Sequence, residues 1–125
     1  MLTFRPYGEN NMVNSKNWSE DQIKQVWLKT AGQFKQYHKD LAGAWMDFSK
    51  YGDTSYDTNE GWEIDHIVPV SMGGSDNIGN LQAIHWKNNR TKSDNYPSFE
   101  TAVSSTSNYN IMYRQSWTYK QRKAV

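Results

Sequence analysis

The sequence predicts one α+β domain, in which a helix precedes a small β-hairpin and a second helix. Three observations indicate this class. A capped helical pattern begins at Ser19, an aromatic and β-branched run covers residues 62–68, and a shorter apolar run at 81–84 leads into a helical segment. The chain has 125 residues and no visible internal repeat, so we expect no second domain.

The first helix is predicted over residues 20–31, after a flexible arm at 1–17. Ser19 is a suitable N-cap, Gln22 completes a capping box three residues later, and Gly32 ends the helix. Apolar side chains recur at helical spacing, namely Ile23, Val26 and Trp27.

The middle of the chain predicts three strands. Residues 44–48 form a short strand candidate between glycine-containing turns. Residues 62–68 and 81–84 follow as the two strands of a hairpin, joined by a loop at 70–79 whose paired glycines allow a sharp turn.

The second helix is predicted from His85 or Trp86 to about Ser93. It ends before Pro97, because the residue before a proline avoids helical geometry.

The last part of the chain, 101–125, is predicted as a basic, aromatic extension. Residues 104–110 are rich in Ser and Asn, which favours a linker. Residues 111–120 alternate loosely and are interpreted as a strand, and 121–125 form a basic end.

Composition excludes several classes of protein. Without cysteine there are no disulfides and no cysteine-ligated zinc, so we expect no structural zinc. Six Trp, eight Tyr and four Phe predict an aromatic-rich core. No apolar run approaches the roughly 20 residues of a membrane span, and residues 1–17 lack the apolar core of a signal peptide. We therefore expect no membrane partner and a cytoplasmic location.

Charge is distributed unevenly behind a net charge of +1. Residues 1–84 carry 7 Lys and Arg against 11 Asp and Glu, a balance of −4, whereas residues 85–125 carry 7 against 2, a balance of +5. The basic excess fits phosphate attraction on one face. A solvated basic tail is the alternative.

Asp65 and His66 are the most informative residues for function. A carboxylate is a hard metal ligand, and histidine is the side chain whose ordinary pKa lies nearest neutrality. Asn80 follows 15 residues after Asp65, and Asn89, a second oxygen donor, follows 24 after it. Two cations, Arg90 and Lys92, follow one and three residues after Asn89. A metal ligand, an imidazole for a water and cations for a phosphodiester together indicate a nuclease.

This pattern resembles the HNH nucleases, whose fold is the ββα-metal or His-Me finger fold. The resemblance spans residues 61–98 and includes the paired glycines, the steps from Asp65 to Asn80 to Asn89, and the run that begins at Asn89. The sequence pattern is similar to that of small phage and bacterial HNH proteins and to that of the HNH domain of RNA-guided CRISPR nucleases. The resemblance implies a nuclease domain at 18–100 with its ββα core at about 61–95.

The resemblance also implies roles for the motif residues. Asp65 and Asn89 would hold one Mg²⁺, for which Mn²⁺ would substitute, and His66 would be the general base. Asn80 would bind no metal but orient His66 by tying the loop; an ordinary turn asparagine is the alternative.

Three further residues are candidates for contact with nucleic acid. Lys92 shares the helical face of Asn89 and is the better candidate for the scissile phosphate, and Arg90 for a neighbouring phosphate. His85, four residues before Asn89, is a candidate for phosphate contact or packing, and for a metal ligand or proton donor. Glu63 shares a strand face with Asp65, where an ion pair and a supporting role both stay open.

The expected function is therefore metal-dependent hydrolysis of DNA in a bacterial or phage-infected cell, by nicking or by double-strand cleavage. A homodimer or larger nuclease assembly is expected where both strands are cut. Two alternatives stay open: a toxin-type nuclease domain, and a nucleic-acid-binding or packaging accessory protein with weak catalysis.

Overall fold

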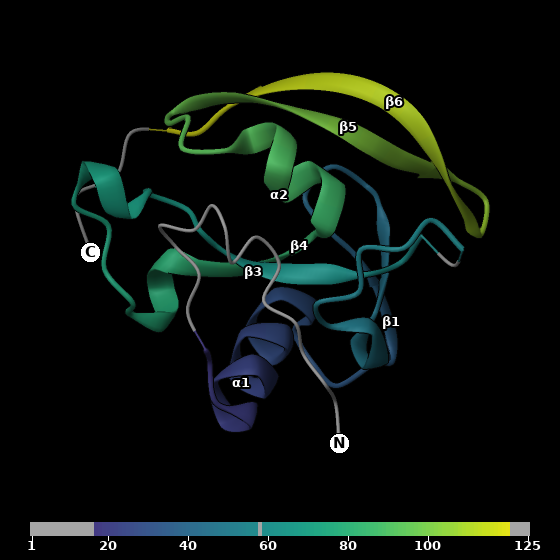
Figure 1. Cartoon of the computed structure of the whole chain (residues 1–125), viewed down its shortest axis with the longest axis horizontal. Helices are drawn as coiled ribbons and strands as arrows, with labels where there is room; N and C mark the ends of the chain where they lie inside the picture. Colours follow the sequence, from purple (N-terminus) through teal and green to yellow (C-terminus); the bar gives the residue numbers. More distant parts are fainter. Residues whose placement is uncertain (1–16, 58, 121–125) are drawn as a thin grey trace.

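The computed structural model describes residues 17–57 and 59–120. Figure 1 shows a central hairpin, β3–β4, with α1 on one side and α2 on the other, and a long second hairpin, β5–β6, covering α2. The helices are α1 (Glu20–Ala31) and α2 (Trp86–Lys92); the strands are β1 (Tyr37–Lys39), β2 (Trp45–Asp47), β3 (Trp62–His66), β4 (Leu81–His85), β5 (Ser98–Thr106) and β6 (Tyr109–Thr118).

Helix α1 forms where its end signals predict it. The Ser19 side chain accepts a hydrogen bond from the backbone N–H of Gln22 at 3.0 Å, and the Gln22 side chain accepts one from the Ser19 N–H at 2.9 Å. Gly32 ends the helix with φ 82°, which glycine adopts without strain. The capping box and the predicted range of 20–31 are confirmed.

The core between α1 and the central hairpin is aromatic, as composition predicts. The ring of Trp62 on β3 lies 4.9 Å from those of Trp27 and Tyr51 and 6.2 Å from that of Phe48, measured between centroids. Aliphatic side chains complete this cluster, namely Val26, Met46, Ile64, Leu81 and Ala83. Edge-to-face and tilted ring pairs of this kind stabilise a core beyond their buried area.

Strands β3 and β4 pair antiparallel, with Asp65 opposite Gln82 and His66 opposite Leu81. Both strands are almost entirely buried. Helix α2 follows β4 without a linker and begins where the Trp86 N–H donates to the Gly61 carbonyl at 3.0 Å. The first strand of the hairpin is shorter than the predicted 62–68, because the chain leaves the sheet after His66.

The C-terminal region differs from the prediction only in part, because the strand predicted at 111–120 is present as β6. Residues 104–110, expected as a linker, belong to the long antiparallel hairpin β5–β6, whose turn is confined to 107–108. Along β5, Phe99, Thr101 and Val103 are buried at every second position, which is the period of a strand lying on α2. The Ser and Asn residues of 104–110 concealed the continuation of the strands there. The predicted basic end at 121–125 lies outside the described residues.

A third, smaller sheet pairs β1 with β2. Strand β2 lies within the predicted 44–48, whereas β1 was not predicted, since three residues are too short for a periodic signal. The arm predicted at 1–17 lies outside the described residues except for Asn17. None of the described helices has the length and apolarity to cross a membrane.

Candidate active site

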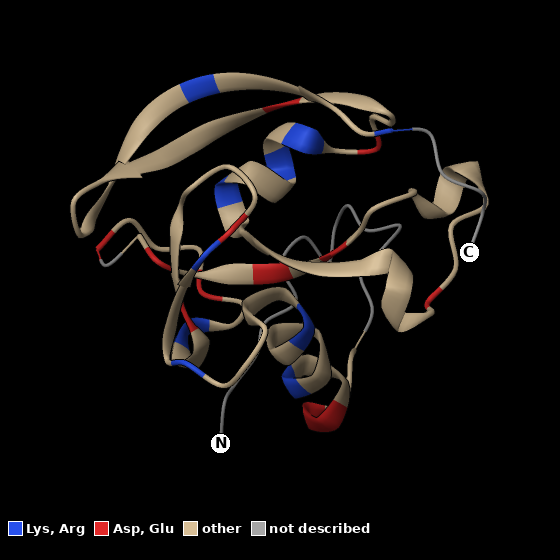
Figure 2. Cartoon of the chain, turned by 180° about the vertical axis from the view of Figure 1, so that it is seen from behind, with Lys and Arg blue, Asp and Glu red and all other residues tan. Residues whose placement is uncertain are grey.

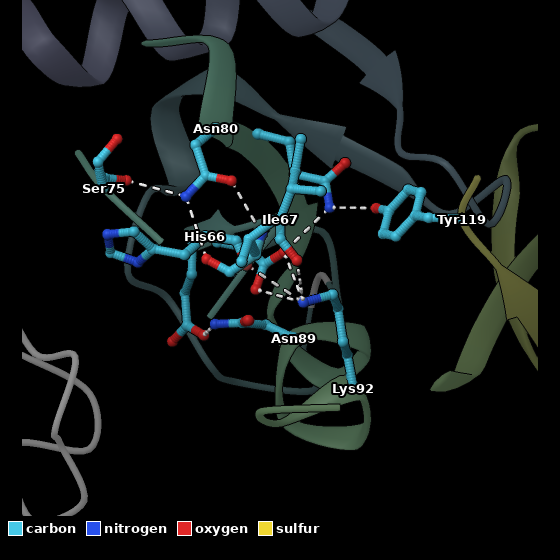
Figure 3. Close-up of polar contacts among 11 residues, drawn as sticks. His66, Ile67, Ser75, Asn80, Asn89, Lys92 and Tyr119 are labelled. Carbon is cyan, nitrogen blue, oxygen red and sulfur yellow. Dashed lines mark hydrogen bonds and ion pairs between the residues drawn. The ribbon is translucent and has the colours of Figure 1, made fainter. Parts of the chain in front are cut away.

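Asp65 lies near the end of β3, at the interface with α2. Its Oδ2 accepts a hydrogen bond from Gln82 Nε2 at 3.0 Å, and the same Nε2 donates to the Tyr119 hydroxyl at 2.9 Å (Figure 3). The residue is buried, and burial raises the pKa of its carboxyl group, a rise that the nearby Lys92 ammonium opposes. The Asp65 carboxylate is therefore a hydrogen-bond acceptor that is held in place and almost excluded from water.

Lys92 is fully buried, with a side-chain exposure of 0%. Its Nζ lies 3.2 Å from Asp65 Oδ2 and 3.3 Å from Oδ1, and it donates to the backbone carbonyls of His66 at 3.2 Å and Ile67 at 3.5 Å (Figure 3). The sequence suggested Lys92 as a contact for the scissile phosphate, a role that stays a prediction. The ammonium neutralises Asp65 and fixes the backbone where the chain leaves β3.

Glu63 and Asn89 meet beside this pair. The Asn89 Nδ2 donates to Glu63 Oε1 at 2.9 Å, and Arg90 Nη2 lies 3.9 Å from Glu63 Oε2. Because side chains two residues apart point to the same face of a strand, Glu63 lies on the same face of β3 as Asp65. Burial raises the pKa of Glu63 to about 7, and the charge of Asp65 adds to that rise. An ion pair was one of the two roles considered for Glu63 from the sequence, and it is present here with Arg90 as the partner.

These oxygens suit a hard cation. Glu63 Oε2 is buried and has no hydrogen-bond partner among the described residues, and a buried acceptor of this kind is costly. Two carboxylates and an amide oxygen match the donor preference of Mg²⁺. Among the described residues, however, no three His, Cys, Asp or Glu side chains form a metal-binding group. A metal here would therefore rely on the Asn89 amide and on waters.

His66 is held on two sides. Its Nε2 lies 2.7 Å from Asp76 Oδ1 in the loop between β3 and β4, and its ring centroid lies 5.8 Å from that of Trp18. Asp65 and His66 point to opposite faces of the strand, so they can serve one site only because the chain turns directly after them.

Asn80 is fully buried and ties that loop together. Its Oδ1 accepts from the Val68 N–H at 2.8 Å, and its Nδ2 donates to the carbonyls of Val68 at 3.1 Å and Ser75 at 2.9 Å (Figure 3). Gly74 lies against the same segment, where a Cβ would meet the Val68 carbonyl oxygen at 1.7 Å. These contacts are those expected of a residue that ties the loop; its effect on His66 stays a prediction.

For His85 the structure supports packing, one of the roles that the sequence left open. The side chain is fully buried, its Nδ1 accepts from the Lys87 N–H at 3.1 Å, and its Nε2 pairs with the Asn59 carbonyl oxygen at 2.8 Å. Since both ring nitrogens are used by the backbone, His85 is not available to a metal or a phosphate. Its i, i+4 spacing to Asn89 suggested a shared face, but His85 precedes the helix as its N-cap.

Three of the seven cations after residue 84 form ion pairs among the described residues. Cations of α2 lie above the carboxylates of β3 in Figure 2, and the ion pairs are Lys92 with Asp65 and Arg90 with Glu63. Arg114 on β6 pairs with Glu100 on β5 at 3.1 Å. Counting charges along the sequence therefore overstated the charge available to a phosphate.

The residues from Tyr51 to Asn95 match a known family model, that of the HNH endonuclease. The match includes β3, β4 and α2, and with them all the motif residues described above. No curated protein and no solved structure matches the chain. This part of the chain is therefore similar to an HNH endonuclease domain, a class of nucleases that acts on nucleic acid.

Sequence reasoning missed two of the residues at this site. Asp76 was noted only as part of the glycine-containing loop, and Gln82 only as a strand residue. No pattern in the sequence singles out either residue, because each is brought to β3 by the fold. Asp76 contacts His66 from the loop, and Gln82 contacts Asp65 from the neighbouring strand. For Glu63 the shared face with Asp65 was the available signal.

Proposed function

We propose that this chain is a metal-dependent DNA endonuclease with a ββα-metal core formed by β3, β4 and α2. The proposal is supported by the contacts between β3 and α2, where Asn89 donates to Glu63 at 2.9 Å and Lys92 Nζ lies 3.2 Å from Asp65, within the segment that matches the HNH family. His66 follows Asp65 at the end of β3. Asp65 and Asn89 would hold Mg²⁺. Glu63 Oε2 accepts no hydrogen bond among the described residues and has only the Arg90 guanidinium 3.9 Å away, which supports that carboxylate as a further ligand. When bound, the ion would stabilise negative charge on the scissile phosphate and the departing oxygen.

His66 supplies the base in this proposal. An ionised carboxylate only accepts hydrogen bonds, so Asp76 requires the proton of a neutral His66 on Nε2. The lone pair on Nδ1 then takes a proton from water. The resulting hydroxide attacks phosphorus in line, and the bond to the 3′-oxygen breaks. The departing 3′-oxygen takes a proton from water, which leaves 5′-phosphate and 3′-hydroxyl ends, as the family resemblance implies.

Arg90 and Lys92 would contact different phosphate groups of the DNA in this proposal. Arg90, which is partly exposed, remains the candidate for a neighbouring phosphate. Lys92 meets the scissile phosphate only if that phosphate approaches Asp65 itself. Because one such site cuts one strand, nicking is the expected outcome for a monomer, and early linear product would indicate a dimer or a larger assembly.

The test is cleavage of supercoiled plasmid by wild type, His66→Ala and the control His38→Ala, with Mg²⁺, with Mn²⁺ and with EDTA. His38 lies on β1 and carries no proposed role. We expect wild type and the control to give open-circle product with either metal and none in EDTA. The cleavage rate of His66→Ala should be lower by a factor of about 10² to 10⁴. Substantial cleavage by His66→Ala would exclude His66 as the base.

A second function, nucleic-acid binding without cleavage, is favoured by one observation. Both oxygens of Asp65 are already paired, with Gln82 and with Lys92, in the described structure. Plasmid that is retarded in a gel but uncut in every metal would support this reading instead.

A further inference from the structure

We propose that Asp76 is a positioning residue for His66, which holds the imidazole in the tautomer and orientation needed for the proton transfer. The inference rests on the proposed function, in which His66 is the base. It adds a residue from the loop between β3 and β4 to a site otherwise built on β3 and α2.

The contact is short and one partner is buried. Nε2 of His66 and Oδ1 of Asp76 are 2.7 Å apart, at the strong end of charge-assisted hydrogen bonds. The His66 side chain is 5% exposed, whereas that of Asp76 is 44% exposed. The histidine is thus enclosed and limited in its rotamers, while the carboxylate reaches it from the solvent side.

The backbone around Asp76 is anchored on both sides. The preceding carbonyl, of Ser75, accepts from the Asn80 side chain at 2.9 Å. The following residue, Asn77, donates its N–H to Ser75 Oγ at 3.2 Å, and its carbonyl accepts from the Asn80 N–H at 2.7 Å. Because Asn80 is fully buried, it transmits the position of the hairpin to Asp76, and the carboxylate is held more firmly than one on a free loop.

A second contact restricts the same ring. The indole of Trp18, just before α1, lies 5.8 Å from the His66 ring at an interplanar angle of 43°. Asp76 fixes one edge of the imidazole and Trp18 packs against the ring, so both the tautomer and the rotation of the ring are constrained.

The chemical role follows from the tautomer. With the proton on Nε2 held by Asp76, Nδ1 is the nitrogen that receives the proton from water. The imidazolium then carries protons on both nitrogens, and the adjacent carboxylate stabilises its charge without taking a proton. The proton returns to solvent after the oxygen–phosphorus bond has formed and the bond to the 3′-oxygen has broken.

The structural readout is the tautomer of His66 in the full-length protein, from ¹⁵N chemical shifts of the imidazole about two pH units above the ordinary histidine pKa. His66→Ala identifies the signals. We expect the Nε2–H form in wild type, a mixture in Asp76→Ala, and the Nε2–H form in Asp76→Asn, whose amide oxygen also accepts. Asp53→Ala is the control, since that carboxylate accepts from the Ser55 N–H in another loop.

The kinetic readout is plasmid cleavage by the same variants. For Asp76→Ala we expect kcat to fall roughly 10- to 100-fold, part of what a positioned base supplies, with KM changed less than about threefold. Asp76→Asn should recover most of this loss, and Asp53→Ala should match wild type. An active Asp76→Ala with an unchanged tautomer would overturn the role of Asp76 alone. A wild type that cuts nothing in any metal would overturn the proposed function, and with it any role of Asp76 in catalysis.

Discussion

Lys92 was interpreted from the sequence as a phosphate contact, but in the fold it is buried and paired with Asp65. A fully buried ammonium is stable only when oxygens surround it, and here they come from Asp65 and from two backbone carbonyls at the end of β3. The ring of Phe99 on β5 lies 5.5 Å from the same Nζ and adds a cation–π contact. Lys92 therefore joins α2, β3 and β5 at the candidate site.

Lys92→Met should destabilise the protein by about 3 to 5 kcal/mol in EDTA, because it leaves Asp65 buried without its counter-ion. Mg²⁺ should recover more stability in this variant than in wild type, since a bound cation would replace the lost charge. Urea denaturation with and without Mg²⁺ measures both effects.

The matched control is Lys87→Met, which removes a cation from the same helix where it lies over the rings of Tyr56 and Trp86. Equal stability of the two variants in EDTA would contradict the structural role of Lys92.

Among the elements, α2 depends on an unusual cap. It has only seven residues, and its N-cap is His85, whose Nδ1 accepts from the Lys87 N–H. A ring nitrogen can accept only when it carries no proton, so the cap requires neutral imidazole with its proton on Nε2, facing the Asn59 carbonyl. Burial lowers the pKa of His85, and neighbouring Lys87 lowers it further, although the Asn59 carbonyl and Asp40 oppose this.

A cap of this kind predicts a pH dependence of stability. Below about pH 6.5 the unfolded chain binds a proton at His85 that the folded chain does not, so the free energy of unfolding falls as pH falls from there towards the lowered pKa. His85→Gln, which keeps a donor and an acceptor without titrating, should lose about 1 kcal/mol less than wild type between about pH 6.5 and 5.5. Urea denaturation at the two pH values checks this, and equal losses would show that His85 is not the cause.

At the scale of the whole molecule, a buried amide joins three elements. Asn88 Nδ2 donates to Asp40 Oδ2 at 3.0 Å and to the Val103 carbonyl at 2.9 Å, and its Oδ1 accepts from the N–H groups of Ala102 and Val103 at 2.8 Å. Asp40 lies in the turn between β1 and β2, where its Oδ1 accepts from two backbone N–H groups at 2.9 Å. This network attaches the β5–β6 hairpin to α2 and both to the small sheet.

Asn88→Ala should therefore destabilise the whole domain by about 3 kcal/mol, because it leaves buried backbone groups of β5 and the Asp40 carboxylate short of partners. Asn95→Ala, an exposed asparagine just after α2, should change stability by less than about 0.5 kcal/mol. Thermal or urea unfolding compares them. A small loss in Asn88→Ala would mean that the hairpin is held by its apolar residues instead.

Local patterns were sufficient for most of the elements near the site. The capping box located α1, the aromatic run located β3, and the residue types and their steps from Asp65 to Asn89 led to the HNH domain that the family match supports. The strand predicted at 111–120 corresponds to β6, whereas the end of β5 was mistaken for a linker because residues 104–110 are rich in Ser and Asn. The strand character of β5 becomes evident only where α2 lies against it.

By itself, the sequence determined the α+β class and the boundaries of the capped helix, since these depend on neighbours a few positions apart. It also determined the set of candidate residues, through residue types at steps of 15 and 24 positions from Asp65. Tertiary structure decided how those residues are paired. Asp76 reaches His66 across 10 positions, Glu63 meets Asn89 across 26, and Asp65 meets Lys92 across 27. Pairings at such separations depend on how the hairpin folds under α2, and burial then decides which charges are neutralised inside the protein and which remain for a substrate.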